Sequence, residues 1–333
     1  MDNCLLYDWI TFSSPCLCLS ECIKWLGLPS NLDWEKQLGS RLRYRYRDFF
    51  HGISIHYTPE DDDKKLNPGV CVEMSGSGCR AFETYTNSDI GALIERIKAY
   101  GYHVSRLDIA YDDFSGVIDL ETMANQARNF WFTSRLQRCA ILSESKISET
   151  EIAGLTVGHG SKSSRIYIRC YDKRYERSAI DELEHWVRFE IQLRDENAMG
   201  FINFSAPLGA KFSGVISNYL NYREQGIDEN KRRWKLSPWW VSFLGDCEKI
   251  SISSKKTEDY NRDRFNAYIW SLRNVIKTAI LLEGPSKFLA DMIAGSEALP
   301  ARYDQLIREC GVHDLNEIRR FMEFYEKEIA NHD

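Results

Sequence analysis

The pattern of apolar and polar positions divides the chain into two parts. Up to about residue 200, short segments alternate in polarity or are rich in β-branched and aromatic residues, which predicts strands. The predicted strands are Leu5–Phe12, Arg41–Phe50, Gly52–Tyr57, Val70–Met74, His103–Tyr111, Arg165–Asp172 and Val187–Arg194. Helical spacing predicts helices between them at Pro15–Leu26, Ile90–Tyr100 and Leu120–Phe130, the last one capped by Asp119. Gly76–Gly78 is predicted to be a turn.

After about residue 200 the strand pattern fades and helical spacing dominates. The helices predicted there are Phe212–Tyr222, Pro238–Leu244, Asp259–Leu282, Ser286–Ala294, Ala301–Cys310 and Leu315–Ile329. We therefore expect an α+β fold, with an antiparallel sheet domain over residues 1–205 and a mostly helical region over residues 206–333. The boundary is placed in the segment Asn203–Gly209.

Three of the predicted strands have one apolar face and one polar face, because successive side chains of a strand point to opposite sides. The polar faces consist of Arg106, Asp108, Ala110 and Asp112; of Arg188, Glu190, Gln192 and Arg194; and of Arg165, Tyr167, Arg169, Tyr171 and Lys173. If the strands share a sheet, acids, tyrosines and cations gather on one side of it.

Such a face is open to two interpretations. Carboxylates mixed with cations suit a hard divalent ion such as Mg²⁺ or Mn²⁺, the cations suit phosphates, and a tyrosine hydroxyl beside them suits a nucleophile. The other interpretation is a solvated sheet face crossed by salt bridges. Composition and periodicity leave both open.

Composition limits the class of protein. The chain has 333 residues, of which 43% are hydrophobic, so a sizeable core is expected. No apolar run approaches the ~20 residues of a membrane span, and the N-terminus lacks the order of a signal peptide. We expect a cytoplasmic protein without a membrane partner. Its ten cysteines are expected to be reduced, with buried thiols favoured over a metal site at Cys4, Cys16, Cys18 and Cys22.

The net charge of −6 argues against a protein that binds nucleic acid over its whole surface, but the positive charge is concentrated in a few segments. Six Lys or Arg and two acids lie between Lys162 and Arg177, and four Arg without an acid lie between Arg41 and Arg47. A third basic group, Lys231–Lys235, contains Trp234. These segments are candidates for contacts with a DNA backbone, and salt-bridged surfaces are the alternative.

Six segments in order resemble the trans-acting initiators of rolling-circle replication, a Rep_trans-like group of plasmids, phages and integrative elements that includes related conjugative relaxases. The segments are LYDWITFS (Leu6–Ser13), GVCVEMSGSGCR (Gly69–Arg80), SRLDIAYDDF (Ser105–Phe114), TVGHGSKSSRIYIRCYDKRYE (Thr156–Glu176), WVRFEIQLR (Trp186–Arg194) and SPWWVSFLGD (Ser237–Asp246). The resemblance runs from about residue 5 to about residue 285. It favours a hairpin turn at Gly158–Gly160, before the tyrosine strand.

The resemblance implies a divergent relative of the HUH nucleases that lacks their His-hydrophobic-His pair, and none of the seven histidines here lie two apart. Such initiators nick one strand of origin DNA at a hairpin or single-stranded site. A tyrosine becomes linked to the 5′-phosphate, and the 3′-hydroxyl primes replication. The implied partners are origin DNA, a host helicase and a second copy of the chain. The alternatives are a conjugative relaxase of an integrative element, or a non-catalytic origin-binding regulator on the same scaffold.

Carried over by position, the resemblance makes Tyr171 the nucleophile and Lys173 its catalytic neighbour, with Tyr167 and Tyr175 as rival nucleophiles. The implied ligands of a divalent metal (Mg²⁺ or Mn²⁺) are Asp108 and Glu190, with Asp112 and Glu73 less secure. Asp113 falls on the opposite face. The candidate DNA contacts are Arg165, Arg169, Arg106, Arg188, Arg194, Arg43 and Arg45. An Arg beside an Asp is more often a structural ion pair, and this alternative stays open.

Overall fold

A computed structural model describes residues 2–38, 44–59, 69–145, 152–177 and 183–249. The chain divides into two compact units, Met1–Lys255 and Lys256–Asp333. The predicted boundary after residue 205 therefore lies inside the first unit, and the helices predicted beyond residue 250 lie outside the described residues. None of the helices within these ranges has the length and apolar content needed to cross a membrane.

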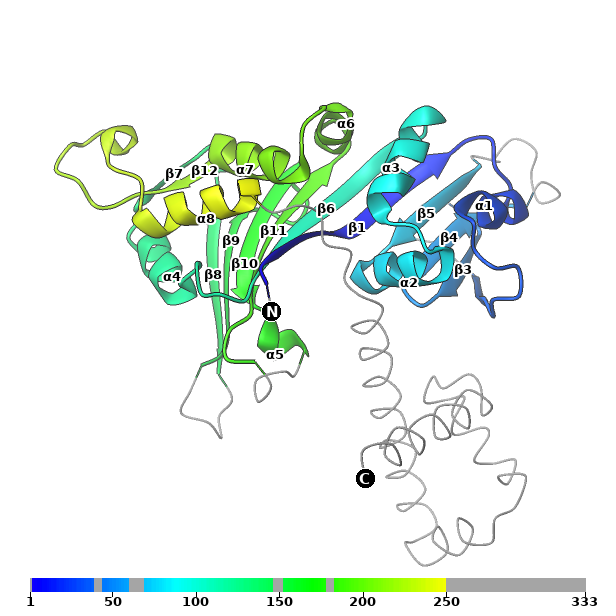
Figure 1. Ribbon diagram of the computed structural model, residues 1–333, viewed down its shortest axis with the longest axis horizontal. Helices are drawn as coiled ribbons and strands as arrows, with labels where there is room; N and C mark the ends of the chain where they lie inside the picture. The colour runs from blue at the N-terminus through cyan, green and yellow to red at the C-terminus, as the bar shows by residue number, and fades with distance from the viewer. Residues whose placement is uncertain (1, 39–43, 60–68, 146–151, 178–182, 250–333) are drawn as a thin grey trace, which may run out of the picture. The chain divides into compact units, whose positions relative to one another are not determined.

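The first unit is built on a ten-stranded sheet in which all neighbouring strands are antiparallel (Figure 1). Its strand order is β2-β3-β4-β5-β1-β6-β11-β10-β9-β8. The strands are β1 (Cys4–Ser14), β2 (Glu35–Leu38), β3 (Tyr46–Phe50), β4 (Ile53–Tyr57), β5 (Val70–Met74), β6 (His103–Asp113), β8 (Cys139–Ser145), β9 (Ile152–Gly160), β10 (Ile166–Asp172) and β11 (Val187–Arg194). The predicted α+β class with an antiparallel sheet is confirmed for the described part of the chain.

Helices cover one face of this sheet. They are α1 (Leu19–Leu26), α2 (Gly76–Thr86), α3 (Ile90–Ala99), α4 (Leu120–Arg128), α6 (Glu196–Asn203), α7 (Leu208–Tyr219) and α8 (Pro238–Lys249). Figure 1 shows α7 and α8 in front of the strands around β9–β11, and α2 and α3 in front of the strands around β1, β4 and β5. The short helix α5 (Lys173–Arg177) follows β10 directly, and a small second sheet pairs β7 (Phe132–Ser134) with β12 (Leu220–Tyr222).

The core lies between the sheet and these helices. Phe189 of β11 contacts Phe212 of α7 and Trp240 of α8, with ring centroids 6.4 and 5.9 Å apart. On the other half of the sheet, Phe12 of β1 meets Trp25 of α1 at 5.8 Å. Trp240 is fully buried. Burial of large aromatic rings dominates the energetics of such a core.

Two glycine-rich segments differ from their predicted turns. Gly76–Gly78 begins helix α2, and Ser75 caps it by accepting a hydrogen bond from the Gly78 N–H. A side chain at position 78 would lie 2.2 Å from the carbonyl oxygen of Gly52, so the helix starts with glycine because two backbones meet there. Gly158–Gly160 belongs to strand β9, and the turn before β10 lies at Ser161–Ser164, where the Ser164 N–H donates to the Ser161 carbonyl.

Candidate active site on the polar face of the sheet

The three strands with polar faces are neighbours in the order β6-β11-β10, and their polar faces point to the same side of the sheet. The register pairs Tyr171 with Arg188 and Arg188 with Asp112. Two residues along each strand, the register pairs Arg169 with Glu190 and Glu190 with Ala110. The expectation that these segments share one sheet and one face is thus met. The alternation found in the sequence is what brings the candidate residues together.

The hydroxyl of Tyr171 lies between a cation and a carboxylate. It donates a hydrogen bond to Oε2 of Glu190 at 3.3 Å and accepts one from Nζ of Lys173 at 3.4 Å. The ring of Tyr171 also lies near two positive groups, with the Lys173 Nζ 5.4 Å and the Arg169 guanidinium carbon 5.2 Å from its centroid. Tyr171 is 8% exposed and Lys173 is buried. An ammonium beside a phenol oxygen favours the phenolate, which is the nucleophilic form of tyrosine.

The two best metal-ligand candidates each bind an arginine. Arg169 donates to both carboxylate oxygens of Glu190 at 2.6 and 2.8 Å, and Arg106 donates to both oxygens of Asp108 at 2.9 and 2.5 Å. The acids are buried, but the arginine side chains are 35% and 22% exposed. Both guanidinium groups therefore reach the acids from the solvent side, and they can exchange these partners for a phosphate.

A third ion-pair group is centred on the buried residues Arg188 and Asp112, and its third member, Asp8, is 19% exposed. Arg188 is 1% exposed and forms a bidentate pair with Asp112 at 2.6 and 2.7 Å, and its remaining nitrogen donates to Oδ1 of Asp8 at 2.8 Å. Burial alone would raise the pKa of Asp8, but Arg188 and Lys173 hold that pKa below its usual value. Arg188 thus lies in a buried ion pair, as in the alternative considered for it, and its predicted contact with DNA stays a prediction. Both carboxylate oxygens of Asp112 accept hydrogen bonds from Arg188 in this pair.

The sequence did not single out Asp8 and Trp9. The register between β1 and β6 shifts between Tyr7 and Trp9, so Asp8 lies in a bulge that adds a residue to β1. Its carboxylate lies against the start of α2, where a side chain on Gly76 would come within 2.8 Å of it. Trp9 pairs with Asp108 across the strands, and its ring lies 3.9 Å from the guanidinium carbon of Arg106. The signal for Asp8 was an acid inside an otherwise apolar strand.

Two carboxylates of this face fit a divalent cation. Burial raises the pKa of Asp108 to about 7; Arg106 opposes this rise, and the nearby carboxylates of Glu190 and Asp8 add to it. Negative charge is therefore crowded around Asp108, which a cation would relieve. Among the described residues, no three His, Cys, Asp or Glu side chains are arranged to hold a metal ion. Mg²⁺ commonly uses only one or two carboxylates together with water and substrate phosphates, so Asp108 and Glu190 are compatible in number with such a site, and metal binding here stays a prediction.

The remaining predicted residues lie at the margins of this site. Glu73 pairs across the sheet with Thr11 and Ser54, on the far side of β1 from Asp108. Arg165 is paired with Glu196, and Arg194 donates to the carbonyl of Lys162. Arg45 precedes β3 and is exposed. Arg41 and Arg43 lie outside the described residues.

The rival tyrosines have different surroundings. Tyr167 lies on the same face as Tyr171, four residues earlier on β10. Burial raises its pKa, Arg169 opposes the rise and Glu190 adds to it. Tyr175 lies past the strand in α5 and lines a separate cavity of about 520 Å³ with Asp119 and His185. Tyr171 is therefore the one of the three whose hydroxyl meets both Lys173 and Glu190.

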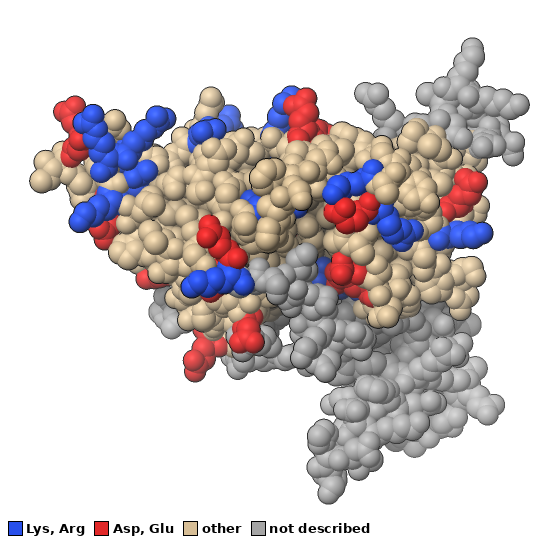
Figure 2. All heavy atoms as spheres, turned by 45° about the horizontal axis from the view of Figure 1, so that its top comes forward, with Lys and Arg blue, Asp and Glu red and all other residues tan. Residues whose placement is uncertain are grey.

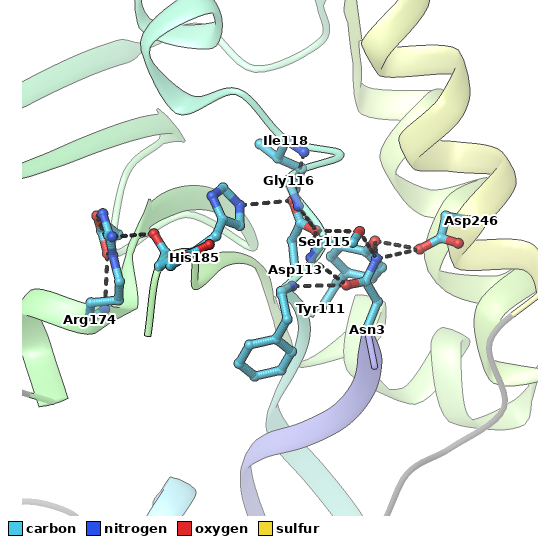
Figure 3. Close-up of polar contacts among 12 residues, drawn as sticks. Asn3, Tyr111, Asp113, Ser115, Gly116, Ile118, Arg174, His185 and Asp246 are labelled. Carbon is cyan, nitrogen blue, oxygen red and sulfur yellow. Dashed lines mark hydrogen bonds and ion pairs between the residues drawn. The ribbon is translucent and has the colours of Figure 1, made fainter. Parts of the chain in front are cut away.

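Asp113 belongs to a structural network next to the site (Figure 3). Its carboxylate accepts hydrogen bonds from the backbone N–H groups of Ser115, Gly116 and Ile118 and lies 3.2 Å from Nε2 of His185. Burial alone would raise the pKa of Asp113, but His185 and the backbone N–H of Ile118 lower it. The expectation that Asp113 stands apart from Asp108 fits this role, since it fixes the loop after β6.

The same view shows how α8 is tied to the sheet. The hydroxyl of Tyr111 donates to Asp246 at 2.5 Å, and the Asn3 side-chain amide donates to both the Tyr111 hydroxyl and Asp246.

The basic group Lys231–Lys235 is partly neutralised, because Arg233 pairs with Asp228 and Lys231 donates to the carbonyl of Phe130. Figure 2 shows one face of the molecule, on which Lys and Arg lie beside Asp and Glu in small mixed groups.

Comparison with known proteins yields consistent matches. Residues 102–283 match the family model described as replication initiation factor, and residues 5–92 match the N-terminal domain of rolling circle replication initiation proteins. The chain is 27% identical over 261 residues to a Bacillus subtilis protein named "Putative DNA relaxase NicK", covering 74% of this chain and 72% of the relative. It also resembles the solved structure of a rolling circle replication initiator from Geobacillus stearothermophilus, with a TM-score of 0.69 and 28% identity, over 77% of this chain and all of that one.

Proposed function

The chain belongs to the replication initiation factor family, and we propose that it nicks one strand of its origin DNA through Tyr171 to start rolling-circle replication. The observation that supports this most is the position of the Tyr171 hydroxyl between Lys173 and Glu190. A purely structural tyrosine does not need an ammonium and a carboxylate at its oxygen. The same face also holds Asp108 and the partly exposed cation Arg169.

In the proposed reaction, the Tyr171 oxygen attacks the scissile phosphorus. A bond forms between that oxygen and phosphorus, and the bond from phosphorus to the 3′-oxygen breaks. The phenol proton passes to Glu190, and the departing 3′-oxygen takes a proton from water. Free tyrosine has a pKa of about 10, so the phenol is mostly neutral at pH 7 and needs this help. Proton transfer to a positioned base contributes roughly 10²- to 10⁴-fold to such rates.

Arg169 and Lys173 act on the phosphate. Arg169 can leave Glu190 for a phosphate oxygen, because its side chain is one-third exposed, and the charge that develops on that oxygen is then stabilised by a fixed cation. Asp108 and Glu190 would hold a divalent cation, which supplies further positive charge at the phosphate. The product is a phosphodiester like the substrate, so the step is reversible and supports both nicking and rejoining.

A conjugative relaxase is the second candidate. It is favoured by the similarity to the protein named as a relaxase, and it uses the same chemistry on a different genetic element. Only an assay of the element itself, replication against mating, separates the two. A non-catalytic origin-binding regulator is disfavoured, because carboxylates beside the tyrosine repel phosphate and serve no purpose in binding alone.

The test uses a supercoiled plasmid carrying the element's own origin, with Mg²⁺ or Mn²⁺. We expect wild-type protein to relax the plasmid and remain attached to a 5′ end, and Tyr171→Phe to lose this activity while remaining folded. Tyr167→Phe and Tyr175→Phe are matched controls and should keep it. Nicking by Tyr171→Phe would transfer the role to another nucleophile, and absence of nicking by wild type with either metal would favour the regulator.

A further inference from the structure

Strand β9 presents two glycines to the polar face beside the predicted DNA contacts. The register pairs Gly158 with Arg169 and Gly160 with Tyr167. Glycine weakens a strand, and in a strand interior it often marks a place where another group approaches the backbone closely. Here the approaching group is Tyr167.

The ring of Tyr167 lies over the backbone of β9. A Cβ atom added to Gly158 would lie 2.8 Å from the Tyr167 hydroxyl and 3.4 Å from Cε2 and Cζ. Because a Cβ rises out of the pleat, the outer end of the ring occupies the space directly above Gly158. The ring therefore lies along the sheet and does not stand upright. Tyr167 is half-buried, with the hydroxyl end of its ring over Gly158 of β9.

The face of β10 alternates aromatic rings and cations. Going back from the nucleophile it presents Tyr171, Arg169, Tyr167 and Arg165, in steps of roughly 6.7 Å because alternate residues of a strand share a face. A single strand of DNA likewise alternates charged phosphates with flat bases. With a phosphate at Arg169, a neighbouring base comes over Tyr167.

We propose that Tyr167, laid flat over Gly158, is a stacking platform for an unpaired base next to the scissile phosphate. This inference rests on the proposed nicking function at a hairpin or single-stranded site, and it assigns Tyr167 to an unpaired base there, since paired bases have no free face at this position. Trp9 lies in the same cross-strand row, through Asp108 and Gln192, and offers a second ring on the other side of the carboxylates. Tyr167 is a binding residue in this account and not a nucleophile.

The experiment uses the full-length chain carrying Tyr171→Phe, which prevents cleavage. The probe is a single-stranded oligonucleotide of the nick site with 2-aminopurine beside the scissile phosphate, whose fluorescence falls when the base stacks. We expect quenching with this protein, and its loss when Tyr167→Ala is added, with binding weakened about 5- to 150-fold as for removal of one base-stacking ring. Tyr167→Phe should keep both, and Tyr100→Ala, a change at the exposed residue that caps the end of α3, should alter neither.

A second pair of variants tests the position of the ring. Gly158→Ala should reduce quenching, because its methyl group displaces the Tyr167 hydroxyl. Adding Tyr167→Phe should restore it, because the ring carbons lie 3.4 Å from the new methyl, an ordinary contact distance. A simple folding defect of Gly158→Ala would not be rescued by removing one hydroxyl.

The outcomes separate this inference from the proposed function. If wild type nicks the plasmid and Tyr167→Ala leaves quenching and affinity unchanged, nicking stands and the platform is overturned. If Tyr167→Phe abolishes nicking, Tyr167 is a nucleophile and the platform is overturned as well. If quenching depends on Tyr167 but no nicking occurs, the base contact stands and the proposed function falls.

Discussion

The two faces of strands β6, β11 and β10 share one backbone and hold side chains of opposite kinds. On the covered face, Tyr111 and Phe189 pack against α8, with ring centroids 5.1 and 4.8 Å from Phe243. On the polar face, acids and arginines pair with each other. The covered face is built for stability, and the polar face gathers the charged groups around Tyr171, the proposed nucleophile.

The polar face itself contains a contrast. The pairs Arg169–Glu190 and Arg106–Asp108 open toward solvent through their arginines, whereas Arg188 and Asp112 are buried like the core and only their partner Asp8 is partly exposed. The first two pairs can exchange partners during a reaction. The third cannot do so without leaving a charge unpaired in the interior, and we assign it to the scaffold.

Breaking the buried group should have the largest effect on stability. Arg188→Met leaves Asp112 and Asp8 without their partner, and loss of one member of a buried ion pair costs about 3–5 kcal/mol. Urea denaturation of the variant should show this loss in the free energy of unfolding. A loss below about 1 kcal/mol would mean that water reaches the two acids and that the group belongs to the working surface.

A smaller effect is expected on the covered face, at acid pH. His159 is fully buried on β9, with Nε2 2.8 Å from the Tyr222 hydroxyl, and burial lowers its pKa from 6.5 to about 4. Because the unfolded chain takes up this proton first, the contribution of His159 to stability is complete above pH 6.5. It is lost as the pH falls toward 4, by about 3 kcal/mol in all.

The measurement is the free energy of unfolding between pH 7 and pH 4, in wild type and in His159→Gln. The variant should lose less stability over this range than wild type does. His103→Gln, at an exposed histidine, is the control and should follow the wild-type curve. Parallel curves for all three proteins would show that water or a local opening reaches His159.

The smallest effect on stability is expected at the Arg169–Glu190 pair, whose arginine is partly exposed. Arg169→Gln removes an ion pair whose cation is one-third exposed but whose acid, Glu190, is buried, and weakening the partner of a buried acceptor costs about 1–3 kcal/mol. Nicking should nevertheless fall strongly, because the variant lacks a cation for the phosphate. Plasmid relaxation and urea denaturation of one preparation give both values, and a large stability loss with unchanged nicking would reverse the assignment of Arg169.

The sequence predicted the polar face well, because a period of two along Arg106–Asp112, Arg165–Lys173 and Arg188–Arg194 determines which side chains share a face. It missed β9, because Gly154, Gly158 and Gly160 lower strand propensity and resemble a turn. The reason for Gly158 lies in Tyr167, on the next strand. Likewise, Asp8 finds its partner 180 residues away, and no local pattern encodes that pairing.

The central claim is that Tyr171 forms the covalent link, and mass spectrometry of the trapped protein–DNA adduct tests it most directly. Trypsin cleaves after Arg165, Arg169, Lys173, Arg174 and Arg177, so the three candidate tyrosines fall in three different peptides. We predict a nucleotide attached to the peptide Cys170–Lys173, whose tyrosine is Tyr171. A nucleotide on Ile166–Arg169 or on Tyr175–Arg177 would contradict the account.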